Sequence, residues 1–183
     1  MLIHILGKGD GWEAIKEVPK GEIVYGCNDA FLRTPTVTHT FHMHDLEAFY
    51  KDKNTHSSTK LCVEHIKDHP EMEFYTVKAW DMIPTAKEYP LQEVVKRFGT
   101  CYFTSSIEYM IAYALMKGAT KLKFYGINMT VKQEYIDQKP GVEFWLGMAK
   151  GMGVEYELQH EYTSLMKTRD GLLYGYLINQ WRV

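Results

Sequence analysis

A glycine-rich segment, GKGDG at positions 7–11, is the first candidate for ligand chemistry. It follows an apolar run at 2–6 and precedes a short helix expected to begin near Trp12. Glycines at such a turn let backbone N–H groups approach an anion, and a following helix N-terminus favours negative charge. We therefore predict that Gly7, Lys8 and Gly9 contact a phosphate. The same pattern is also typical of a strand-to-helix turn that binds no ligand.

A cluster of hydroxyl side chains begins the clearest helical segment. Thr104, Ser105 and Ser106 precede an apolar stripe of helical period at 106–117. Their hydroxyls and the free amides of the helix start can form a second cradle for an anion or a ribose. Ser105 with Glu108 also fits a capping box, which explains the same residues without a ligand. Both interpretations can hold together.

Two amide side chains follow predicted strands. Asn28 comes after a strand at 22–26, where an amide can bond a ribose hydroxyl or a base edge, although it is equally typical of a turn. Gly126 and Asn128 close a strand at 121–126, with Tyr135 and Gln138 in the segment beyond. We predict that Asn28, Gly126, Asn128 and Tyr135 contribute to nucleotide binding.

The histidines of the segment FHMHD are the candidates for acid–base chemistry. His42 and His44 point to the same face if the segment is a strand, and Asp45 follows them. Two histidines make an incomplete metal site, so we interpret them as catalytic or polar pocket residues. We predict neither a metal nor a cofactor.

The elements that must position these residues alternate between apolar runs and segments of helical period, which is typical of stacked β-α-β units. We predict one domain over residues 1–183, of the α/β class, with a mostly parallel sheet of about six strands and helices on both faces. Ligands bind beyond the carboxyl ends of the strands in such sheets. The predicted strands are 2–6, 22–26, 37–41, 74–78, 121–126 and 154–158. The predicted helices are 106–117, 142–150 and one in the polar segment 51–70 that starts near Ser57 or Ser58 and ends before Pro70, while 79–90 is predicted as a loop.

The composition excludes several classes of protein. The net charge is −2, from 21 basic and 23 acidic residues without a basic run, so we expect no nucleic-acid partner. No apolar stretch approaches the roughly 20 residues of a membrane span, and the first residues lack the features of a signal peptide, so a cytoplasmic protein is expected. The three cysteines, Cys27, Cys62 and Cys101, are predicted to be buried thiols. A homodimer is expected only from the base rate for soluble proteins.

The chain resembles a family of uncharacterised tailed-phage proteins of Rossmann-like fold. The resemblance covers nearly the whole chain and is carried by ILGKGDG, YGCNDAF, FHMHDL, the block 102–129, QKPGVEFWLGMAKGMG and the terminal LLYGY. It implies a phage origin and the host cytoplasm as the working compartment.

A more distant resemblance links the chain to the CMP-sialic acid-dependent sialyltransferases of glycosyltransferase family 42 and to pterin diphosphokinase-like proteins. Four short motifs of the sialyltransferases have matching positions in this chain. They are the GNGPS loop at 7–11, the CN pair at 27–28, the TSGVYM helix start at 104–110 and the GID strand end at 126–128. Lys8, Asp10 and Gly11 replace the family's Asn, Pro and Ser, and Asn128 stands where the family has an acid. The segment 129–143 contains no histidine to match the family's general base, so His42 or His44 would have to replace it.

Two functions are consistent with these patterns. The first is a phage nucleotide-binding protein that transfers a group from a nucleotide-sugar-type donor, as the resemblance to glycosyltransferases implies. The second is a non-catalytic binder that sequesters a nucleotide signal of host defence, a counter-defence role that loss of the family's base would fit. In both, the partner is a nucleotide or a nucleotide-derived small molecule.

Overall fold

A parallel sheet of seven strands organises the molecule. The computed structural model describes residues 1–45 and 58–168. Within them the strand order is β5-β4-β3-β2-β1-β6-β7, and every pairing is parallel. The strands are β1 (Leu2–Leu6), β2 (Val24–Cys27), β3 (His39–His42), β4 (Glu73–Thr76), β5 (Ala86–Glu88), β6 (Lys121–Tyr125) and β7 (Glu155–Glu157).

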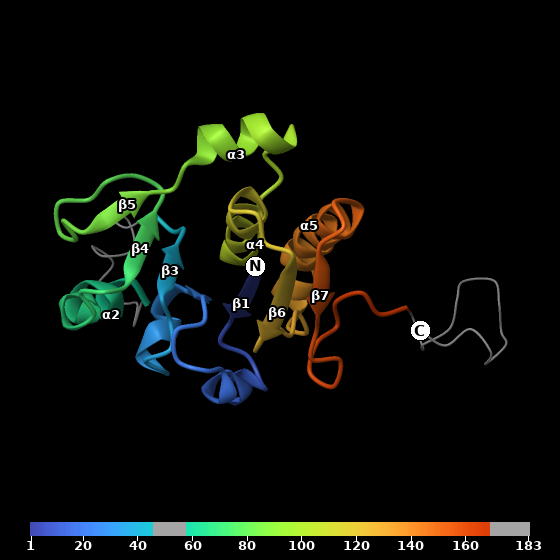
Figure 1. The fold of residues 1–183 in the computed structure, drawn as a ribbon, viewed down its shortest axis with the longest axis horizontal. Helices are drawn as coiled ribbons and strands as arrows, with labels where there is room; N and C mark the ends of the chain where they lie inside the picture. The colour runs from blue at the N-terminus through green and yellow to red at the C-terminus, as the bar shows by residue number, and fades with distance from the viewer. Residues whose placement is uncertain (46–57, 169–183) are drawn as a thin grey trace, which may run out of the picture.

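Helices cover both faces of this sheet, so the predicted Rossmann-like α/β fold is confirmed. Figure 1 shows α3 (Leu91–Phe98), α4 (Ser106–Met116) and α5 (Lys139–Gly151) on one side. The other side carries α2 (Ser58–His65) and two 3-10 helices, η1 (Trp12–Glu17) and η2 (Asn28–Leu32). A further 3-10 turn, η3 (Ile66–Asp68), follows α2, and a π-helix, η4 (Glu134–Gln138), leads directly into α5.

One prediction about these elements was wrong, and one helix was missed. The segment 79–90 contains the strand β5, whose Lys87 and Glu88 are exposed at the sheet edge and therefore gave no apolar run. The helix α3 was missed, although Leu91, Val94 and Phe98 recur at helical spacing, and Val94 is its one buried residue. The predicted start at Ser57 lies outside the described residues, whereas Ser58 begins α2. The LLYGY motif also lies outside them.

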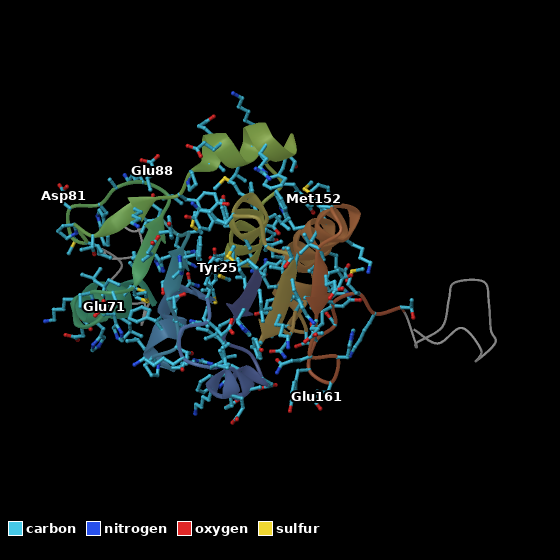
Figure 2. The ribbon with its side chains drawn as sticks, in the orientation of Figure 1. Tyr25, Glu71, Asp81, Glu88, Met152 and Glu161 are labelled. Atoms are coloured by element: carbon cyan, nitrogen blue, oxygen red, sulfur yellow. The ribbon has the colours of Figure 1, made fainter. Side chains whose placement is uncertain are left out.

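The core has one layer on each face of the sheet. Ile3 and Ile5 of β1 pack with α4 and α5, including Trp145, while Leu6 and Phe74 pack with η1, η2 and α2 on the opposite face. Figure 2 shows Tyr25 of β2 in the interior, where its ring lies 5.9 Å from that of Tyr113 in α4. Because β1 is buried on both faces and central, it anchors the loop that follows it.

The cysteine prediction holds only in part. Cys27 and Cys62 are buried free thiols, but Cys101 is exposed in the connection between α3 and α4. Among the described residues, no helix is long and apolar enough to cross a membrane.

Candidate functional site

The GKGDG loop closes tightly against the end of β6. The N–H of Gly7 donates to the carbonyl of Tyr125, and the N–H of Gly9 donates to the carbonyl of Gly126, both at 2.8 Å. A Cβ at Gly7 would lie 2.3 Å from the Gly126 oxygen, and one at Gly9 would lie 1.6 Å from Asn128 Oδ1. Close packing within the chain therefore explains these glycines, and their two N–H groups are already used.

Asn128 ties this loop to a turn near the end of the described chain. Its Nδ2 donates to the carbonyls of Asp10 at 3.2 Å and Tyr162 at 3.0 Å. Gly126 adopts a positive φ of 62°, and its N–H donates to Gln159 Oε1 at 3.0 Å. The amide hydrogens predicted to face a ligand at this corner thus bond to the protein itself.

The start of α4 has the predicted capping box, which is confirmed. Ser105 Oγ accepts from the N–H of Ile107, and the N–H of Ser105 donates to Glu108 Oε2 at 2.6 Å. Thr104 Oγ1 donates to the other carboxyl oxygen at 2.7 Å. Glu108 is fully buried, and this burial raises the pKa of its carboxyl group. Of the three predicted hydroxyls, that of Ser106 makes no hydrogen bond within the described residues.

The end of β2 is different, because a buried acceptor there lacks a donor. Asn28 has a positive φ of 52°, and its Oδ1 has no hydrogen-bond partner among the described residues. Beside it, Lys8 Nζ lies 2.6 Å from Asp29 Oδ1, and Arg33 Nη1 donates to the Lys8 carbonyl at 2.7 Å. Lys8 is thereby held at the same corner as the unpaired amide oxygen.

The two predicted catalytic histidines occupy different environments. His42 is fully buried behind the cavity wall, with Nε2 2.8 Å from Thr59 Oγ1. Burial, followed by the neighbouring His44, lowers its pKa to about 3, so it is neutral at ordinary pH. His44 lines the cavity, and burial together with the charge of Lys8 lowers its pKa as well. The structure therefore brings one of the pair to the cavity and uses the other as support.

A cavity of about 390 Å³ gathers most of the predicted residues at the carboxyl edge of the sheet, a size within the usual range for small-molecule sites. Tyr135 lies outside the lining, half exposed, with Lys139 Nζ 4.5 Å from its ring centroid. The predicted residues in the lining are Gly7, Lys8, Gly9, Asn28, His44, Thr104, Ser105, Ser106, Gly126 and Asn128.

The π-helix η4 supplies two lining residues, Glu134 and Gln138. Glu134 was missed because the segment after β6 shows no apolar stripe from which its inward face could be identified. Cys27 also lines the cavity, and burial raises the pKa of its thiol to about 11. Within the described ranges, no group of three or more His, Cys, Asp or Glu side chains is arranged to hold a metal ion.

Comparison with known proteins identifies the fold. No family model and no curated protein matches the chain. The sialyltransferase CstII from Campylobacter jejuni, in complex with the substrate analogue CMP-3FNeuAc, is similar with a TM-score of 0.59 and 15% identity, over 90% of this chain and 84% of that one. The sialyltransferase CST-II with a trisaccharide acceptor and CMP has a TM-score of 0.55 and 12% identity, over 90% and 86%.

An alpha-2,3-sialyltransferase from Campylobacter jejuni in its apo form is similar to the same degree, with a TM-score of 0.55 and 15% identity over 90% of this chain and 79% of that chain. The predicted phage origin and the predicted link to pterin diphosphokinase-like proteins find no support in these comparisons. At such low identity the likeness concerns architecture alone, and the chain has the Rossmann-like fold that these sialyltransferases share.

Proposed function

We propose that the cavity binds a nucleotide and that the protein transfers a group from a nucleotide-sugar donor. The observation that carries this proposal is Asn28, which lines the cavity and whose buried Oδ1 has no hydrogen-bond partner among the described residues. A buried acceptor without a donor costs roughly 1–3 kcal/mol. If the Asn28 side chain turns into the cavity, a ribose hydroxyl or an exocyclic amino group of a base would supply that donor.

The charges of the cavity support a phosphorylated ligand. Lys8 is the one Lys or Arg among the described residues that line it, and its Nζ is held beside Asn28 by Asp29. Ser106 offers a hydroxyl at the start of α4, where the helix dipole favours an anion. With a phosphate bound between Lys8 and Ser106, the nucleoside part of the ligand would contact Asn28.

Cytidine nucleotides are the first ligands to test, because two of the similar structures hold CMP or a CMP-linked analogue. Transfer from such a donor needs positioning and charge stabilisation, which Asn28 and Lys8 would provide. His44 remains a candidate for proton transfer or for a hydrogen bond to the departing phosphate, with His42 supporting it from behind.

The test has two parts. Isothermal titration of the pure protein with CMP, UMP and AMP measures binding, and release of CMP from CMP-linked sugars measures transfer or hydrolysis. Binding with release supports the transferase. Binding without release would leave the protein as a non-catalytic nucleotide binder, and no binding of any of the three nucleotides at millimolar concentration would reject the site.

A further inference from the structure

Glu134 contributes a carboxylate to the cavity that the sequence patterns did not identify. It is the one acidic residue among the described residues that line the cavity, and it is half buried there. Its element, η4, is a π-helix that continues directly into α5, and π-helical turns often occur at functional sites. An acidic side chain in the wall of a site proposed for an anionic ligand needs an explanation.

The neighbouring acidic residues already have structural roles, whereas Glu134 has none. Asp29 pairs with Lys8, and Glu108 caps α4. Asp137, on the same π-helix, accepts a hydrogen bond from Gln133 and lies outside the cavity lining. Among the described residues, no hydrogen bond or ion pair engages the carboxylate of Glu134. It is therefore available to a bound molecule.

The position of Lys8 separates the two possible bases of the cavity. His44 follows β3, and Asp29, which holds Lys8 Nζ, follows β2, so His44 and the Lys8 charge lie on the same side of β1, where the phosphate would bind. Glu134 belongs to η4, which follows β6 on the other side of β1. In a direct displacement the nucleophile enters opposite the departing phosphate, so its base must come from a wall other than that of Lys8.

On the basis of the proposed function, we infer that Glu134 is the general base that activates the acceptor hydroxyl. In this step the acceptor oxygen forms a bond to the anomeric carbon while the bond from that carbon to the phosphate oxygen breaks. The electron pair of the broken bond leaves with the nucleoside monophosphate. The proton of the acceptor hydroxyl, or of water in hydrolysis, passes to the carboxylate of Glu134.

The experiment compares Glu134→Gln with Asp137→Asn. Both variants remove one negative charge from the same π-helix, but only the first changes the cavity. CMP affinity is measured by isothermal titration, and turnover is measured as CMP released from CMP-N-acetylneuraminic acid and from a panel of other CMP-linked sugars. General-base catalysis contributes about 10²–10⁴-fold to a rate.

We expect Glu134→Gln to lower kcat at least about 100-fold while CMP affinity stays within about twofold, and Asp137→Asn to match the unaltered protein. Turnover of Glu134→Gln near that of the unaltered protein would overturn the inference, and so would equal losses in both variants. An unaltered protein that binds CMP but releases none from any donor would refute the catalytic role alone. Failure to bind CMP, UMP or AMP would instead refute the proposed function.

Discussion

The two sides of the cavity differ in what their polar atoms already do. On the side formed by the GKGDG loop, the end of β6 and the start of α4, Asn128 and Glu108 bond to other parts of the chain. On the side formed by the end of β2, where Asp29 holds the side chain of Lys8, Asn28 keeps a buried oxygen without a partner among the described residues. An asparagine therefore holds the cavity together on one side, whereas an asparagine on the other side keeps an oxygen without a partner.

This difference teaches that the type of a residue at a strand end does not reveal whether its polar atoms are free. Asn28 and Asn128 both follow strands of the same sheet and both line the cavity. Only the hydrogen-bond partners distinguish them. The substitutions below separate the two sides by asking which lower stability and which lower binding.

The largest effect is expected at Glu108. Replacing it with Ala leaves a cavity and removes the acceptor of Ser105 and Thr104, so we expect a loss of about 3–4 kcal/mol in the free energy of unfolding. Urea denaturation measures this loss. Glu108→Gln keeps the shape and one acceptor oxygen, and should lose less. If Glu108→Ala were as stable as the unaltered protein, the hydrogen bonds at the start of α4 would not stabilise the fold.

A matched pair compares the two amides directly. Asn128→Gly should lower the free energy of unfolding by about 2–3 kcal/mol, because two hydrogen bonds to Asp10 and Tyr162 are lost. Asn28→Gly suits the positive φ at that position and should change stability little. It should weaken CMP binding by about 1–3 kcal/mol. Thermal unfolding and isothermal titration with CMP measure the two effects. The comparison would be contradicted if Asn28→Gly lowered stability and Asn128→Gly lowered only CMP affinity.

The histidine behind the cavity makes stability depend on pH. Burial lowers the pKa of His42 to about 3 in the folded protein, against 6.5 in the unfolded chain. Below pH 6.5 the unfolded chain binds a proton that the folded protein does not, so stability falls as pH falls towards 3. Between pH 7 and pH 5 this amounts to about 2 kcal/mol. Urea denaturation at pH 7 and pH 5 should show that His42→Asn loses less unfolding free energy between the two pH values than the unaltered protein does. An equal loss in both proteins would contradict the lowered pKa of His42.

The smallest effect comes from one methyl group at two glycines. Gly9→Ala places a Cβ against Asn128 and should lower the free energy of unfolding by about 1–2 kcal/mol. Gly147→Ala is the control, because a Cβ there meets no atom within 4 Å on the exposed side of α5. That change should raise stability by about 0.5–1 kcal/mol. Thermal unfolding that shows the same sign for both variants would remove the packing explanation for Gly9.

The sequence was sufficient to predict most of the sheet and the place where ligands would bind. Buried strands such as β1 and β6 have apolar residues at their inward positions, which predict a strand from local pattern alone. The edge strand β5 buries too few side chains to leave such a pattern, whereas the apolar residues of α3 at 91, 94, 95 and 98 do have helical spacing and could have predicted it. Because the carboxyl ends of parallel strands share one edge, residues at several strand ends could be predicted to meet.

The sequence could not predict which side chains face the cavity and which atoms are already bonded. His42 and His44 are two residues apart, yet Thr59 from a distant helix engages only the first of them. Glu134 faces the cavity because of a π-helical turn, which has no reliable sequence pattern. Such facts depend on contacts between segments far apart in the chain.

The central position of β1 also governs how the chain reaches its native state. Leu2 pairs in register with Lys121, so the middle of the sheet joins residues 119 positions apart. A contact of such long range forms only after a large loop has closed, and closing that loop costs conformational entropy. Such contacts therefore slow folding. On a ribosome, β1 can pair early with β2, but its second edge must wait until β6 has emerged, and the cavity at the ends of these strands forms late.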